Sequence, residues 1–258
     1  MKYIITLLIT VVFTTICYAS TANDTVYIQL GEFFPAKRYD IGVSIFINCI
    51  YTHIEPSYFE PMKREGWYDL SKDEKTNDFI LTESNISVGK DYNDCLQDSI
   101  TYVSSENNIM MIRGITQKNR KIKSIVPDKN SVRPGENMDF IFNNKKYILR
   151  GEGIITQDNK VYIIDGYQND NTGEEIFNYK LYLSTTNKEQ LLLSMPKFKS
   201  TFVEILLIGD LDRDGKPDFV FDVSRDYEER RVMLFLSSPA QKNEIVRIID
   251  EAIYIFDC

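Results

Sequence analysis

The sequence has 258 residues, 43% of them hydrophobic and 26% charged, and its formal net charge is -8 at pH 7. This length can form one large or two modest domains with a buried core. The acidic charge disfavours nucleic acid and anionic membranes as partners and favours cations. With His53 as the single histidine, the chain also lacks the clusters of histidine and cysteine that zinc sites use.

The first 19 residues follow the plan of a secretory signal peptide. Lys2 supplies a positive start, residues 4–16 are apolar or hydroxylic and uncharged, and Ala19 is a small residue at a plausible cleavage point. The apolar run is shorter than the ~20 residues that a membrane-spanning helix needs. We therefore expect an exported protein, periplasmic, cell-surface or secreted, with no integral membrane span after cleavage.

The rest of the chain is predicted to be mostly β-strand. The expected strands are 25–30, 42–51, 99–103, 109–112, 138–142, 146–151, 153–156, 161–164, 177–184, 190–195, 202–208, 218–223 and 231–236. In 177–184, Phe177, Tyr179, Leu181 and Leu183 alternate onto one face. We predict antiparallel sheets with few short helices, arranged as a sandwich, a barrel or a partial propeller-like meander.

Three segments do not fit this strand pattern directly. Segment 60–78 is polar and fits a loop or a short helix, and segment 116–133 is basic, contains Pro127 and fits a linker. Segment 243–255 fits a short helix or a final strand equally well. With the linker as a boundary, we predict an N-terminal β-rich domain at 20–125 and a C-terminal antiparallel β domain at 126–258.

The stretch GDLDRDGKPDFVFD, residues 209–222, places four carboxylates close together. Counted from Asp210 as position 1, Asp212, Asp214 and Asp218 stand at positions 3, 5 and 9, and a glycine stands at position 6, where the chain must turn. Lys216, at position 7, can offer its backbone carbonyl while its side chain points to solvent. This is the ligand spacing of a calcium loop, and a bound cation would cancel the repulsion between the carboxylates.

The flanking residues distinguish this loop from a helix-flanked EF-hand. Position 12 is Phe221 instead of glutamate, and β-prone segments lie on both sides. The loop resembles the D-x-D-x-D-G-x-x-D calcium loops of FG-GAP repeats, the integrin-type propeller motif, and of VCBS repeats. The resemblance covers about residues 203–231 and implies one structural calcium ion on a strand-to-strand loop. Arg213 departs from the small residue usual there, and we expect its side chain to face solvent.

Removal of residues 1–19 leaves Cys49, Cys95 and Cys258. An oxidising compartment favours one disulfide and one leftover thiol. We expect Cys49 to pair with Cys95, with a staple formed by Cys258 as the alternative.

These features favour an exported, non-enzymatic calcium-binding protein that presents a surface to a protein or glycan partner. The alternative is a secreted hydrolase of glycans or peptides that uses a carboxylate pair as acid and base. Such an enzyme needs a cleft with two carboxylates away from the ion loop, whereas a binding module does not. A further alternative is that the loop no longer binds an ion.

Overall fold

The computed structural model describes residues 41–106, 108–115, 120–158, 162–164, 167–169, 173–198 and 201–255. The expected signal peptide and the expected strand 25–30 lie outside these residues. Among these described residues there are two short 3-10 helices, η1 (Pro56–Tyr58) and η2 (Glu60–Arg64). The strands are β1 (Ser44–Phe46), β2 (Cys49–Thr52), β3 (Tyr68–Lys72), β4 (Phe79–Glu83), β5 (Ser87–Asn93), β6 (Asp98–Ser104), β7 (Met110–Arg113), β8 (Arg120–Ile125), β9 (Asn137–Phe142), β10 (Lys145–Asp158), β11 (Tyr162–Ile164), β12 (Tyr167–Asn169), β13 (Gly173–Ser184), β14 (Glu189–Phe198), β15 (Glu204–Asp210), β16 (Asp218–Asp222), β17 (Glu229–Leu236) and β18 (Arg247–Ile255). The mostly β, antiparallel prediction is confirmed.

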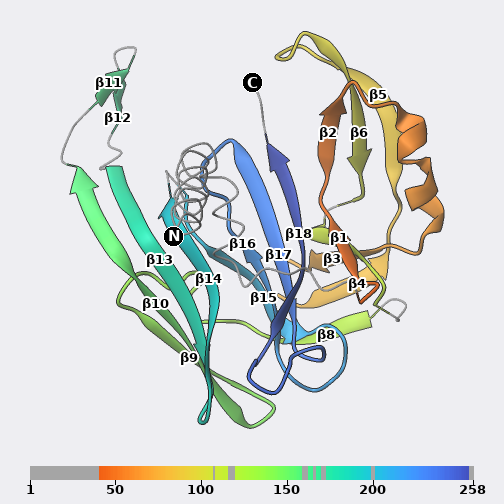
Figure 1. The fold of residues 1–258 in the computed structure, drawn as a ribbon. Coiled ribbons are helices and arrows are strands. Elements are labelled where there is room, and N and C mark those ends of the chain that lie inside the picture. Colours follow the sequence, from red (N-terminus) through yellow and green to blue (C-terminus); the bar gives the residue numbers. More distant parts are fainter. Residues whose placement is uncertain are drawn as a thin grey trace, which may run out of the picture.

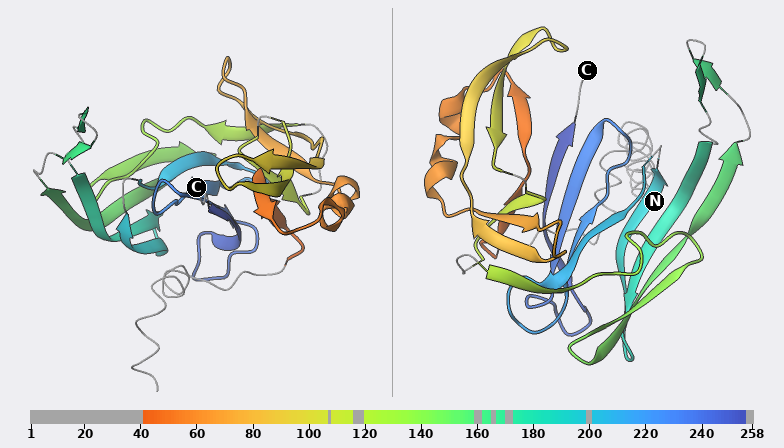
Figure 2. Two further views of the ribbon diagram at one scale, coloured as in Figure 1. Left: turned by 90° about the horizontal axis from the view of Figure 1, so that it is seen from above. Right: turned by 180° about the vertical axis from the view of Figure 1, so that it is seen from behind.

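Within the described residues the strands form one large sheet and three smaller ones. The large sheet has nine strands in the order β1-β7-β3-β4-β8-β15-β16-β17-β18. The smaller sheets are β14-β13-β10-β9, β2-β6-β5 and the hairpin β11-β12. Figures 1 and 2 show the three-stranded sheet on one side of the large sheet and the four-stranded sheet on the other. No helix in this described part is long and apolar enough to cross a membrane.

The nine-stranded sheet curls until its two edge strands meet. The backbone N–H of Ile45 in β1 donates to Asp250 Oδ2 in β18 at 3.0 Å. The interior of this nearly closed barrel is filled by apolar side chains from both halves of the sequence, including Leu70, Leu81, Ile112, Ile122, Leu207, Val220 and Leu234. Strands β1, β3, β4, β7 and β8 precede residue 126 and β15 to β18 follow it, so the segments predicted as two domains share one sheet.

The C-terminal strands of this sheet are apolar on both faces. Val220 in β16 points into the barrel, whereas Phe219 and Phe221 point outward into a second core shared with the four-stranded sheet. Phe140 of β9 meets Phe219 edge to face, with ring centroids 6.1 Å apart. Burial of one such ring contributes about 1.5–3 kcal/mol, so the strand that follows the aspartate loop is firmly held on both sides.

The hairpin β9–β10 forms as predicted at Asn143-Asn144. Both asparagines have positive φ, 46° and 62°, as a two-residue hairpin turn requires. In β13, Tyr179, Leu181 and Leu183 are buried on one face as predicted. Phe177 is not among the buried residues, because Asn178 has φ 50° and the register with β10 shifts there, so that Ile176 faces the core instead.

Segment 60–78, predicted as a loop or a short helix, and segment 116–133, predicted as a linker, both contain strands. Segment 116–133 includes β8, which lies between β4 and β15 and buries Ile122 in the barrel. Segment 60–78 includes η2 and β3. Both segments are rich in charged residues and have few apolar ones. They form strands nevertheless, because pairing with neighbouring strands outweighs the local sequence preference. Segment 243–255, left open between helix and strand, contains β18.

The expected disulfide between Cys49 and Cys95 does not form. Cys49, at the start of β2, is a free and buried thiol. Burial raises its pKa to about 11, although a hydrogen bond with Tyr51 acts in the opposite direction. The alternative that involves Cys258 lies outside the described residues.

Candidate metal centre

The aspartate loop joins two neighbouring antiparallel strands, as predicted. Asp210 is the last residue of β15, and Asp218 is the first residue of β16. Between them the chain bends sharply, with φ 66° at Arg213 and φ 80° at Gly215. The second value falls at position 6, where glycine adopts a left-handed conformation without strain. The side chain of Arg213 is exposed, as expected.

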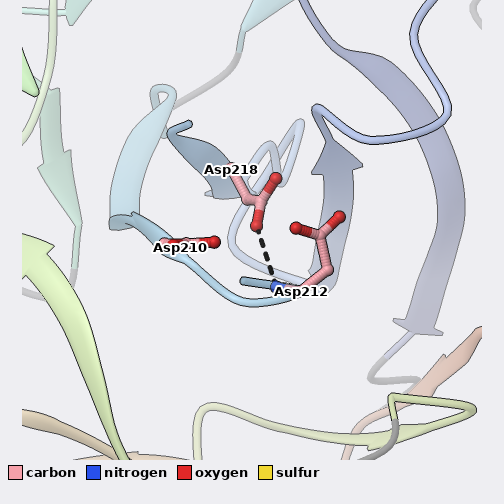
Figure 3. A group of neighbouring side chains, drawn as sticks. All are labelled: Asp210, Asp212 and Asp218. Atoms are coloured by element: carbon pink, nitrogen blue, oxygen red, sulfur yellow. Dashed lines mark hydrogen bonds between the residues drawn. The ribbon is translucent and has the colours of Figure 1, made fainter. Parts of the chain in front are cut away.

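Three of the four predicted carboxylates converge. Figure 3 shows Asp210, Asp212 and Asp218 pointing toward a common centre. One carboxylate oxygen from each lies within 4.8 Å of the others. Oxygens bound to one calcium ion at ~2.3–2.6 Å can be at most about 5 Å apart. The spacing therefore matches the first shell of such an ion.

Two oxygens in this cluster are buried and have no hydrogen-bond donor in the part of the chain that the structure describes. They are Asp210 Oδ1 and Asp212 Oδ2. The Asp210 residue is only 8% exposed, and its other oxygen accepts the Gly215 N–H at 3.2 Å. An unsatisfied buried acceptor costs about 1–3 kcal/mol, and more when it is charged. A cation at the centre would satisfy both atoms.

Asp218 is the innermost carboxylate and is fully buried. Its Oδ2 accepts the N–H of Leu211 at 2.6 Å, and its Oδ1 accepts the N–H and hydroxyl of Ser237 at 2.8 and 3.1 Å. Burial, followed by the charge of Asp212, raises the pKa of Asp218 well above its ordinary value despite these bonds. Burial likewise raises the pKa of Asp210. A positive charge in the site would therefore stabilise the ionised forms of these buried carboxyl groups.

Asp214 is not part of this converging group. Its Oδ1 accepts the Lys216 N–H at 2.8 Å and the Ser237 hydroxyl at 2.9 Å, and its Oδ2 pairs with Lys216 Nζ at 2.7 Å. Burial raises its pKa, but these bonds outweigh burial and hold the pKa below its ordinary value. Of the predicted ligands, the structure thus gathers Asp210, Asp212 and Asp218, and it places Asp214 beside them with Lys216.

Three residues outside the loop shape the site, and the sequence analysis missed them. Arg120 of β8 donates to the backbone carbonyls of Asp210 (3.4 Å) and Leu211. Asn143, at the β9–β10 turn, donates to the carbonyl of Gly215 at 2.6 Å. Ser237, directly after β17, binds both Asp214 and Asp218. These contacts depend on strand pairing and sheet packing, which no local pattern reveals.

Arg120 brings a positive charge next to the carboxylates without forming a direct ion pair with them among the described residues. Burial, followed by the nearby charge of Arg213, lowers the pKa of its guanidinium, whereas Asp210, Asp212 and Asp218 act in the opposite direction. The Nε atom of Arg120 is buried and has no hydrogen-bond partner within the described ranges. Arg120 therefore fixes the backbone of the loop and leaves the centre of the carboxylate cluster open.

A hollow of about 380 Å³ elsewhere on the nine-stranded sheet is also acidic, with Asp69, Asp73, Glu83 and Glu106 in its lining. Asp69 accepts hydrogen bonds from Ser84, Ser105 and Asn108. Asp73 accepts two backbone N–H groups of its own turn. Asp69 and Asp73 are thus engaged in holding local structure, and the hydrolase alternative stays a prediction.

No protein-family model, curated protein or solved structure shows significant similarity to this chain. The fold and the candidate site define the class: a mostly β protein with an acidic loop between two antiparallel strands. Within that class, the resemblance to the calcium loops of FG-GAP and VCBS repeats stays a prediction that depends on the loop residues themselves.

Proposed function

We propose that this protein is an exported, non-enzymatic calcium-binding β protein whose ion is structural. The ion stabilises the loop between β15 and β16, and the stiffened surface serves as a binding module at the cell envelope or outside the cell. The observation that carries this proposal is the pair of buried oxygens that have no donor among the described residues, Asp210 Oδ1 and Asp212 Oδ2. They belong to a cluster in which one carboxylate oxygen each of Asp210, Asp212 and Asp218 lies within 4.8 Å of the others.

The chemistry of the donors favours calcium over the other common cations. All the donors are hard oxygen atoms, which transition metals with a preference for nitrogen or sulfur do not favour. Magnesium demands near-ideal octahedral geometry and keeps several waters, whereas calcium accepts six to eight oxygens in irregular arrangements. A strand-to-strand loop that offers three carboxylates, backbone carbonyls and water suits calcium better.

The ligand set proposed here follows the loop spacing. Asp210, Asp212 and Asp218 supply carboxylate oxygens, Lys216 supplies its backbone carbonyl, and Asp214 joins after it releases the side chains of Lys216 and Ser237. Sites in extracellular modules bind calcium in the ~0.1–1 mM range, which suits a compartment rich in calcium. At a hundredfold excess over the dissociation constant, such binding stabilises the folded state by about 2.7 kcal/mol.

Thermal unfolding with 10 mM CaCl2 and with EGTA tests the proposal. For a chain of this size, a gain of about 2.7 kcal/mol corresponds to a rise in Tm of roughly 5–10 °C. The double variant Asp212→Asn/Asp214→Asn should lose this rise. In EGTA its Tm should stay close to that of the wild type, because the weakened bonds of residue 214 to Lys216 and Ser237 offset the relief of repulsion at residue 212. A wild-type Tm that is the same in CaCl2 and in EGTA would rule out a stabilising calcium ion.

A further inference from the structure

A groove of about 740 Å³ lies directly beside the aspartate loop. Four connections that lie at one end of the molecule form it: the β9–β10 turn, the β13–β14 turn, the β17–β18 loop and the aspartate loop itself (lower end of Figure 1). Its volume falls within the ~300–1,000 Å³ that is usual for sites that bind small molecules.

The charge of this groove is opposite to that of the whole protein. Its lining includes Lys145, Lys146, Lys188 and Lys216 but one acidic residue, Glu244, although the chain carries a net charge of -8. Lys146 pairs with Asp139, and Lys216 pairs with Asp214. Among the described residues, Lys145 has no carboxylate partner and Lys188 donates only to the Glu244 carbonyl at 3.2 Å. Both ammonium groups therefore remain available to an anion.

The other lining residues favour a carbohydrate over a protein. They include hydroxyl and amide side chains, such as those of Thr185, Thr186, Asn187 and Gln241, which can bond to sugar hydroxyl groups. Protein partners, in contrast, bind most tightly through aromatic and arginine anchors that fill desolvated pockets. Lysines and polar uncharged side chains in one groove suit a ligand that carries both carboxylates and hydroxyls.

The groove and the candidate metal centre share residues. Lys216 lines the groove, and its ammonium is held by Asp214 at 2.7 Å. Ser237 also lines the groove and bonds to both Asp214 and Asp218. A cation that recruits the Asp214 carboxylate would free the Lys216 ammonium for a ligand in the groove. By linkage, the ligand would then strengthen cation binding by the same factor.

We propose that this groove binds a carboxylated oligosaccharide, and that a cation in the aspartate loop strengthens this binding by releasing Lys216 from Asp214. The inference rests on the proposed function, because the coupling needs the cation. It adds the class of partner and assigns the ion a second role besides stabilisation.

Isothermal titration calorimetry on the full chain tests the proposal. The probes are hexasaccharides of hyaluronan, chondroitin and oligosialic acid, with neutral chitohexaose as the control, each in 2 mM CaCl2 and in EGTA. At least one carboxylated probe should bind at least about tenfold more tightly than chitohexaose in CaCl2. An exposed ion pair contributes up to about fivefold in affinity, so Lys145→Gln/Lys188→Gln should weaken the binding of that probe about tenfold. The matched variant Lys63→Gln/Lys90→Gln, which removes the same charge far from the groove, should not.

The coupling has its own readout. EGTA should weaken the probe about fivefold in the wild type, and Lys216→Met, which keeps the backbone carbonyl, should remove that difference. Equal affinity of the wild type in CaCl2 and EGTA would overturn the coupling. The groove assignment would be overturned if no carboxylated probe bound the wild type more tightly than chitohexaose does. It would also be overturned if the carboxylated probes bound the Lys145→Gln/Lys188→Gln variant as tightly as the wild type. A calcium titration without sugar separates the two claims, because calcium binding there supports the proposed function even when the groove assignment fails.

Discussion

Asp212→Asn should change stability in opposite directions with and without calcium. Asp212 is half-buried, its Oδ2 has no donor, and its carboxylate faces those of Asp210 and Asp218 within 4.8 Å. At an effective dielectric constant of about 20, each ionised pair at this distance repels by on the order of 3 kcal/mol. Partial protonation of the two neighbours and solvent screening reduce this value. We therefore expect the variant to be more stable than the wild type by about 1–2 kcal/mol in EGTA at pH 7.5.

In 10 mM CaCl2 the order should reverse. The wild type gains about 2.7 kcal/mol when calcium is a hundredfold above the dissociation constant, whereas the variant lacks one charged ligand and should gain less than about 0.5 kcal/mol. Urea unfolding followed by circular dichroism and by the fluorescence of Trp67, the single tryptophan, measures both differences. Asp91→Asn, at an exposed position of β5, is the matched control and should change neither.

The reasoning is refuted if Asp212→Asn is no more stable than the wild type in EGTA, because the carboxylates would then not be repelling one another. It is refuted equally if calcium stabilises the variant and the wild type by the same amount. In that case the ion would bind elsewhere.

Three further predictions concern other parts of the structure. Asn143→Gly keeps the positive φ of the turn but removes the bond to the Gly215 carbonyl, so unfolding should become easier by about 1 kcal/mol; Asn144→Gly, measured in the same denaturant series, should not show this loss. The pKa of Asp218 is raised in the folded state. This shift stabilises the folded state fully at pH values below the pKa of the unfolded chain, near 4, and the stabilisation is lost as the pH rises through the pKa of the folded state. Protons therefore compete with calcium, and the calcium-induced rise in Tm should shrink as pH falls from 8 toward 5; a rise that grows instead would contradict the site. Cys49 is buried with a pKa of about 11, so peptide mapping after iodoacetamide treatment at pH 8 should find it unmodified in the folded protein and modified in urea.

The strands with regular alternation could be predicted from the sequence. The hairpin at Asn143-Asn144 and the strands on both sides of the aspartate loop form where the pattern places them, because their β-branched and aromatic residues face a core on at least one side. Strand β8 could not be predicted this way. Its residues RKIKSI are mainly polar, and they form a strand because β4 and β15 pair with them on either side.

The candidate site also has one part that the sequence could predict and one part that it could not. The loop spacing predicted that four carboxylates meet, and the structure gathers those of Asp210, Asp212 and Asp218 at one centre but not that of Asp214. The contribution of Arg120 is non-local, because it is 90 residues away from Asp210 in the chain and reaches the loop through the β8–β15 pairing. The bond between Asp214 and Lys216 depends on side-chain conformation, which spacing alone does not determine.

The central claim is that oxygen atoms of the aspartate loop surround a calcium ion. A long-wavelength anomalous difference map of crystals grown in 10 mM CaCl2 tests it most directly. We predict a peak ~2.3–2.6 Å from one carboxylate oxygen each of Asp210, Asp212 and Asp218. A featureless map between these three side chains, with the loop well ordered around water alone, would contradict the account.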